Sequence, residues 1–258
     1  MDDLQLALHL ADLADLHSMK RFRAGDLVVH TKPDLTPVTE ADQAVERALR
    51  EALSEHRPHD GILGEEYGSE GMDSPRRWIL DPIDGTKNYV RGVPVWATLI
   101  GLMDGTDIVT GVVSAPAMGR RWWATLGSGA FTLDPGSDMP RQLRVSAVQA
   151  LSDASFSYSD SRGWAERGCA DGLQTLLDTT WRQRAYGDFW SHMLVAEGAI
   201  DVAAEPDLQS YDMAALIPIV VEAGGRFTSY TGGDSLVDGC ALSTNGRLHD
   251  EVVSLLAR

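Results

Sequence analysis

The sequence predicts a mixed α/β protein, with an α+β N-terminal half and an α/β C-terminal half. Early in the chain, apolar residues twice recur at helical spacing and are followed by short apolar runs typical of strands. In the second half, strand-like and helix-like segments alternate. The chain has 258 residues, of which 43% are hydrophobic and 23% charged, so it can bury a sizeable core.

The N-terminal half is expected to begin with two helices joined by a loop at residues 31–39 that is rich in Pro and Thr. The sequence from Thr39 to Asp42, TEAD, has the pattern of a capping box at the start of the second helix. The apolar positions are Leu4, Leu8, Ala11, Leu16 and Met19 in the first helix, and Val45, Ala48, Leu49, Ala52 and Leu53 in the second.

Strands are expected at residues 78–80, 93–103, 108–116 and within 121–133, with a hairpin turn at Asp104-Gly105. The short polar stretch at residues 135–140 is the candidate boundary, which divides the chain into residues 1–138 and 139–258. Helices are then expected at residues 172–179, 189–198, 212–223 and 248–256.

Charge and hydropathy exclude several classes of function. The formal net charge of −16 disfavours nucleic acid and anionic membrane surfaces as partners. Apolar runs such as residues 93–103 are too short to cross a bilayer. The acidic start is unlike a secretory signal, so we expect a cytoplasmic protein. Cys169 and Cys240 are expected to be free, buried thiols.

Residues 81–88, DPIDGTKN, are the most informative segment. Asp81 and Asp84 offer two carboxylates on a bend at Pro82, and carboxylates are hard oxygen ligands for Mg²⁺. Gly85 and Thr86 then offer backbone N–H groups at an expected helix start, where phosphate oxygens bind. The alternative is a pair of ordinary Asp-Pro and Asp-Gly turns, which explains either half of the segment better than the whole.

Two further acidic features accompany this segment. Glu65 and Glu66 follow an apolar pair, and on an extended segment only one of the two would face a site. Asp212 opens an expected helix that ends at Gly224-Gly225, and by itself it would be interpreted as a helix cap.

Together these segments resemble the inositol monophosphatase superfamily of metal-dependent, lithium-sensitive phosphatases. The resemblance runs through nearly the whole chain, although Tyr211 stands where Trp is usual and Leu216 where a small residue is usual. It implies a layered αβαβα sandwich with the site between the two halves, and a homodimer. The residues that carry it are residues 64–66, residues 78–89, and residues 211–215 leading to residues 222–225.

The resemblance implies two or three Mg²⁺ ions, with Mn²⁺ as a possible substitute. Glu65, Asp81 and the backbone carbonyl of Ile83 would hold one ion, Asp81, Asp84 and Asp212 a second, and a looser third would lie near Glu65. It also implies direct hydrolysis of a phosphate monoester by a metal-activated water.

The resemblance further assigns catalytic roles to Thr86 and Asp42, as a pair that removes the proton, and to Glu65. Asp42 is also a good capping residue, and both roles can hold together. Lys32 resembles a family lysine near the third metal, with a solvated loop lysine as the alternative.

We expect residues 184–190, RAYGDFW, together with Glu205, to recognise the alcohol part of the substrate. A carboxylate at Asp188 favours a cationic alcohol, and the aromatic pair Phe189 and Trp190 suits a planar ring unless it packs in the core. These residues, with Arg184, look most like the histidinol-phosphatase branch, which implies L-histidinol phosphate as substrate. The alternatives are a broad inositol-1-phosphate or sugar monophosphatase, or a Mg²⁺-binding regulatory protein on the same fold.

Overall fold

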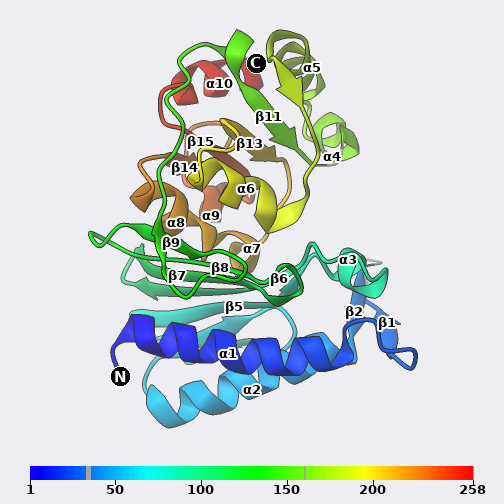
Figure 1. The fold of residues 1–258 in the computed structure, drawn as a ribbon, viewed down its shortest axis with the longest axis vertical. Coiled ribbons are helices and arrows are strands. Elements are labelled where there is room, and N and C mark those ends of the chain that lie inside the picture. The colour runs from blue at the N-terminus through cyan, green and yellow to red at the C-terminus, as the bar shows by residue number, and fades with distance from the viewer. Residues whose placement is uncertain (33–35, 160, 258) are drawn as a thin grey trace.

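A computed structural model of the chain describes residues 1–32, 36–159 and 161–257. Five layers are stacked in Figure 1: a helix pair, an eight-stranded sheet, a layer of helices, a five-stranded sheet and an outer group of helices. The expected αβαβα sandwich is therefore confirmed. Within the described ranges, no helix has both the length and the apolar character that a membrane crossing requires.

The first layer consists of α1 (Asp3–Arg21) and α2 (Glu40–His56), which pack on the large sheet in Figure 1. Both helices were expected, and the capping box of α2 is present. The apolar face expected for α1 is confirmed at Leu4, Leu8 and Ala11 but wrong at Leu16 and Met19, which are 70% and 42% exposed. The face that meets α2 and the sheet is the one buried, and it consists of Leu6, Ala7, Leu10, Ala11, Ala14 and Ser18.

The large sheet has the strand order β10-β9-β8-β7-β6-β5-β3-β4. Only β3 and β5 pair in parallel, and the expected hairpin joins β6 to β7. A separate two-stranded sheet pairs β1, which ends where the expected loop begins, with β2, which lies within that loop. Residues 93–96 precede β6 instead of belonging to it. The strand bounds are β1 (Val29–Thr31), β2 (Pro37–Thr39), β3 (Gly61–Gly64), β4 (Gly68–Glu70), β5 (Arg76–Asp84), β6 (Ala97–Asp104), β7 (Asp107–Ala115), β8 (Arg120–Thr125), β9 (Ala130–Leu133) and β10 (Arg141–Gln142), and the short helix α3 is Thr86–Val90.

The second sheet has the strand order β12-β11-β13-β15-β14. Helices α6 and α8 fill the layer between the two sheets, and α4, α5 and α10 cover the outer face of the second sheet. The bounds are β11 (Ser155–Tyr158), α4 (Ser161–Glu166), α5 (Ala170–Thr179), β12 (Arg182–Gln183), α6 (Asp188–Ala196), β13 (Val202–Glu205), α7 (Ser210–Met213), α8 (Leu216–Glu222), β14 (Arg226–Thr228), α9 (Ser235–Asp238), β15 (Ala241–Thr244) and α10 (His249–Leu256).

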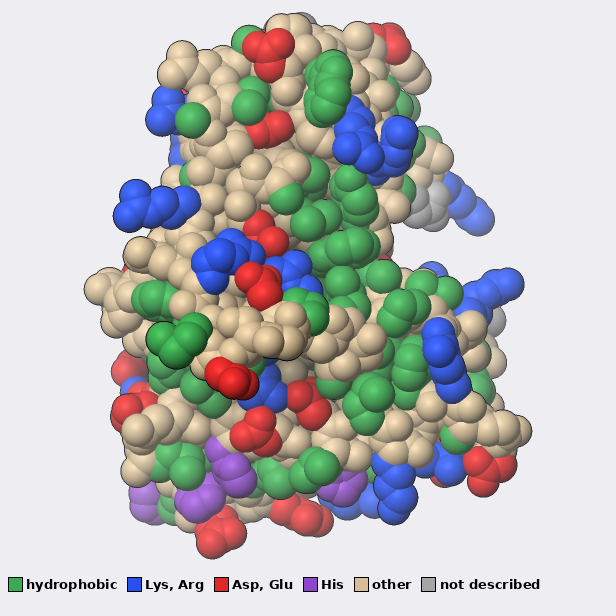
Figure 2. Space-filling view, in the orientation of Figure 1, with side chains coloured by type: hydrophobic (Ala, Val, Ile, Leu, Met, Phe, Trp, Pro, Cys, Tyr) green, Lys and Arg blue, Asp and Glu red, His purple; other side chains and the backbone are tan. Residues whose placement is uncertain are grey.

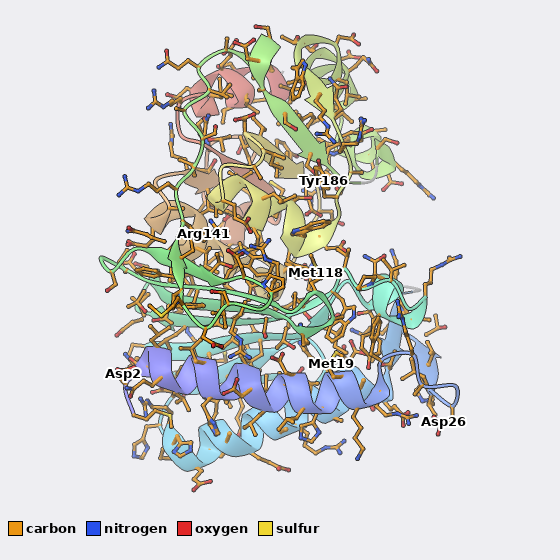
Figure 3. All side chains as sticks on the ribbon, viewed as in Figure 1. Asp2, Met19, Asp26, Met118, Arg141 and Tyr186 are labelled. Atoms are coloured by element: carbon orange, nitrogen blue, oxygen red, sulfur yellow. The ribbon has the colours of Figure 1, made fainter. Side chains whose placement is uncertain are left out.

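The junction between the layers is apolar and tightly packed. Figure 3 labels Met118, which follows β7, and Tyr186, which precedes α6, and both pack against the core between the sheets. Figure 2 shows hydrophobic side chains gathered in the middle of the same face.

The helix expected at residues 212–223 is interrupted, so that α7 and α8 are separate. Pro218 has no N–H, and the carbonyl of Ala214 therefore loses its helical partner. The interrupted segment lies directly on the large sheet. A Cβ at Gly111 would lie 2.2 Å from the Ala215 carbonyl oxygen, and a Cβ at Gly101 would lie 2.8 Å from the Ala214 Cβ. These two glycines let the chain approach the sheet just after Asp212.

We expect Gly111→Ala to destabilise the protein by about 1–3 kcal/mol, because the added methyl group overpacks this contact. Urea unfolding followed by circular dichroism measures the change. Gly25→Ala is the matched control, because nothing lies within 4 Å of a Cβ at Gly25. Equal unfolding midpoints for the two variants would contradict the close approach.

Candidate active site

A bulge in β5 brings Asp81 and Asp84 to one side of the strand. Asp81 pairs with Leu99 and Asp84 with Ala97, so three steps along β5 match two steps along β6. In a regular strand, residues three apart point to opposite faces, and one extra residue reverses this. Pro82 lies inside the bulge, where its missing N–H leaves no ladder bond unmade. The sequence DPID therefore places both carboxylates together.

Asp212 joins these two carboxylates from α7. One carboxylate oxygen from each of the three residues lies within 4.8 Å of those of the other two. The backbone N–H of Phe189 donates to Asp84 Oδ2 at 2.9 Å, and that of Gln209 donates to Asp212 Oδ2 at 2.6 Å. Asp81 is 2% exposed, and its Oδ1 has no hydrogen-bond partner among the described residues.

The crowding of these carboxylates is electrostatically unfavourable. Burial, followed by the charges of neighbouring carboxylates, raises the pKa values of Asp81 and Asp84 well above their usual range. The pKa of Asp212 rises to about 7, mainly through burial. A bound divalent cation would relieve the repulsion and supply the partner that Asp81 Oδ1 lacks. The donor set, which consists of carboxylate oxygens, fits Mg²⁺.

Glu65 lies beside this cluster, immediately after β3. Its charge contributes to the raised pKa values of Asp81 and Asp212. Lys32 Nζ lies 2.7 Å from Glu65 Oε1 and 2.7 Å from Glu66 Oε1. The expectation that the two glutamates diverge was wrong, because the segment is a turn in which one ammonium group reaches both. Burial raises the pKa of Glu66 to about 7.

Glu46 holds this turn in place and was missed in the sequence. Its side chain, on α2, is fully buried. Its Oε2 accepts from the backbone N–H of Glu66 at 2.7 Å, and its Oε1 accepts from that of Tyr67 at 3.1 Å and from Arg50 Nε at 2.8 Å. A Cβ at Gly64 would lie 2.0 Å from Glu46 Oε1, which explains the glycine. The available signal was a charged residue next to Val45 on the apolar face of α2.

Asp42 divides its two oxygens between two contacts. Oδ2 accepts from the backbone N–H of Thr39 at 2.8 Å and from its hydroxyl at 2.6 Å, which completes the helix cap. Oδ1 lies 3.3 Å from the hydroxyl of Thr86, which also lies 3.0 Å from the Ile83 carbonyl oxygen. Burial raises the pKa of Asp42 to about 6. The cap and the contact with Thr86 are therefore both present.

Asp188 is the first residue of α6 and lies close to the helix start at Gly85. Its φ of 44° is in the left-handed region, which Asp adopts more readily than most residues. Asn88 Nδ2 donates to Asp188 Oδ2 at 3.2 Å. Burial and the negative charge of Glu205 raise the pKa of Asp188 to about 6, and Lys87 opposes the shift.

Glu205, at the end of β13, is 8% exposed and lies 3.3 Å from His192 Nε2. The structure does not bring Arg184 into this group, since its side chain is exposed and donates to the Gln183 carbonyl at 2.6 Å. Of the two alternatives left open for Phe189, core packing is the one observed, because the side chain is buried with its ring centroid 6.0 Å from that of Trp122.

Comparisons with known proteins point to the same family as the fold and the carboxylate cluster. The model of the inositol monophosphatase family matches residues 4–258. A histidinol-phosphatase from Streptomyces coelicolor is 56% identical over 99% of this chain and 97% of its own length. A histidinol-phosphatase from Mycobacterium tuberculosis is 55% identical over 99% of this chain and 98% of its own length.

Solved structures agree as well. The extragenic suppressor protein SuhB from Bartonella henselae has a TM-score of 0.88 at 30% identity and covers 98% of both chains. The IMPase from Thermotoga maritima has a TM-score of 0.86 at 28% identity, covering 100% of this chain and 97% of its own. The chain therefore belongs to the inositol monophosphatase family, as its motifs predicted.

Proposed function

We propose that the chain is a Mg²⁺-dependent phosphatase that hydrolyses L-histidinol phosphate to L-histidinol and inorganic phosphate, a step of histidine biosynthesis. The observation that carries the proposal is the position of Asp188 and Glu205, whose charges both act on Asp84 of the carboxylate cluster. An ammonium or imidazolium group suits two such carboxylates better than a neutral polyol does. The names of the relatives from Streptomyces coelicolor and Mycobacterium tuberculosis support this substrate.

Two or three Mg²⁺ ions, or Mn²⁺ ions as a substitute, would be held by oxygen ligands near the end of β5. These ligands are the carboxylates of Glu65, Asp81, Asp84 and Asp212 and the backbone carbonyl of Ile83. Bound Mg²⁺ neutralises phosphate charge and lowers the pKa of water, which supplies the nucleophile. The charge of Lys32 next to Glu65 and Glu66 limits how much negative charge remains for a cation on that side.

The chain's own residues bind the two ends of the substrate. Backbone N–H groups of Gly85 and Thr86, at the start of α3, would hold phosphate oxygens. Asp42 would accept a proton through the Thr86 hydroxyl, which lies 3.3 Å from its Oδ1. Asp188 and Glu205 would hold the cationic alcohol. Arg184 also belongs to this substrate-binding proposal, although it is exposed and would have to reorient.

We further propose a cytoplasmic homodimer that is inhibited by Li⁺ and binds neither nucleic acid nor membranes. Broad inositol-1-phosphate hydrolysis is the second candidate. It is favoured by an inositol-1-monophosphatase from Rhizobium meliloti, 37% identical over 81% of this chain and 77% of its own length. A purely regulatory Mg²⁺-binding protein is disfavoured, because Thr86 and Asp42 retain their contact beside the carboxylates.

Asp188→Asn tests the substrate. Asn tolerates the positive φ at this position, so the variant removes the charge while keeping the backbone. We expect KM for L-histidinol phosphate to rise about tenfold or more, with little change for inositol-1-phosphate, because only the first substrate loses an ion pair. Phosphate release with Mg²⁺ measures both, and Asp171→Asn, at an exposed position on α5, is the control. Equal effects on both esters would favour the broad monophosphatase.

Asp42→Asn tests the proposed proton acceptor. We expect turnover to fall by about 10²-fold, because an amide cannot take the proton, while the folded state persists. Asp2→Ala is the matched comparison, since it weakens the cap of α1 by about 1 kcal/mol but removes no hydrogen bond of Asp42 or Thr86. Turnover and urea unfolding of both variants separate the two roles. Near-normal turnover in Asp42→Asn would remove this residue from the mechanism.

Asp81→Asn tests the metal site through stability. Without Mg²⁺, the variant should be more stable than the wild type, because one of the mutually repelling carboxylates is gone. With Mg²⁺, the order should reverse, because the wild type gains more binding free energy. Thermal unfolding with EDTA and with saturating Mg²⁺ measures the crossover, and Asp73→Asn, at an exposed position, should show none. If Mg²⁺ raised the unfolding temperature of the wild type and of both variants equally, the result would argue against this site. Turnover that survives EDTA would argue against it as well.

A further inference from the structure

Helix α6 carries a second polar residue on the side that faces Glu205. His192 follows Asp188 by four residues, and such residues share one face of a helix. The imidazole of His192 is fully buried, with its ring centroid 5.4 Å from that of Phe227. A buried polar ring of this kind must have partners for its nitrogens.

Both nitrogens of His192 have such partners. Nδ1 lies 2.8 Å from Ser243 Oγ on β15, and Nε2 lies 3.3 Å from Glu205 Oε1 at the end of β13. A carboxylate only accepts hydrogen bonds, so Nε2 carries the proton and donates to Glu205. In the neutral ring, Nδ1 then accepts from the Ser243 hydroxyl. The hydrogen bonds therefore run in one direction, from Ser243 through His192 to Glu205.

We propose that His192 is a positioning residue that orients the Glu205 carboxylate toward the cationic alcohol part of the substrate. This inference rests on the proposed function. A glutamate side chain has several rotatable bonds, and a hydrogen bond from a packed helix selects one arrangement among them. Asp188 lies on the same face of α6 as His192. One helix then determines the positions of Asp188 and Glu205, the two carboxylates proposed to bind the alcohol.

Two amide substitutions separate the two hydrogen bonds of the ring. The amide nitrogen of His192→Gln can reach the position of Nε2, whereas the shorter side chain of His192→Asn reaches only that of Nδ1. Binding of L-histidinol to the Mg²⁺-loaded protein is measured by calorimetry in the presence of inorganic phosphate. We expect Kd to rise about tenfold in His192→Asn and to stay within about threefold of the wild type in His192→Gln.

The control for a general effect of losing a buried histidine is His249→Asn. His249 is also fully buried and bonded at both nitrogens, to Thr228 and Thr244, but it lies on α10. It should leave the Kd of L-histidinol unchanged, and the inhibition constant of inorganic phosphate should be unchanged in all variants.

Equal Kd values for L-histidinol in His192→Asn and the wild type would overturn the inference. An equal rise of this Kd in the Asn and Gln variants would overturn it as well. If His192→Asn fails to fold, Ser243→Ala decides, because it removes the anchor of the ring and leaves Glu205 in place. Weaker L-histidinol binding with unchanged phosphate inhibition then supports the inference, and unchanged binding overturns it. Failure of the proposed function is seen separately, as a wild-type protein that neither binds L-histidinol nor hydrolyses its phosphate.

Discussion

Mutual repulsion among the carboxylates at the end of β5 is the constraint on which the site depends. Asp81 and Asp84 are forced together by the bulge, and Asp212 is added from α7. The chain brings no lysine or arginine into contact with these three carboxylates, according to the ion pairs of the described residues. A bound cation would supply the missing positive charge, which would link the binding of metal to the stability of the fold.

Most of these acidic residues are oriented by hydrogen bonds that leave their charge in place. Asp84 and Asp212 each accept a backbone N–H with one oxygen, and Asp42 does the same as part of its helix cap. A backbone N–H fixes the direction of a carboxylate without neutralising it, so negative charge remains for the cation. Glu46 also accepts backbone N–H groups, but both of its oxygens do so, and they hold the turn beside Glu65.

The sequence predicted what local chemistry determines. The segment at residues 81–88 and the cap at Thr39 depend on residues within a few positions of one another, and both appear as expected. The position of Leu16 was predicted wrongly, and the sequence could not decide whether Phe189 packs in the core or contacts substrate, because each depends on which face of a helix meets a distant element. Glu46 and His192 were missed for a related reason, since their partners other than Arg50 lie 13 to 51 residues away and only the fold brings them together.

The proposed function divides chemistry from specificity between the two halves of the chain, with Asp212 as the exception. The N-terminal half supplies Asp81, Asp84 and the pair Thr86 and Asp42, whereas Asp212 and the proposed alcohol-binding residues Asp188 and Glu205 come from the second half. The two halves meet where the backbone N–H of Phe189 donates to Asp84. Under this proposal, substitutions along α6 would alter which alcohol is bound without altering the groups of the N-terminal half that surround phosphorus. The same bond ties the start of α6 to the carboxylate cluster, so a change that displaces this helix turn would affect both halves of the site.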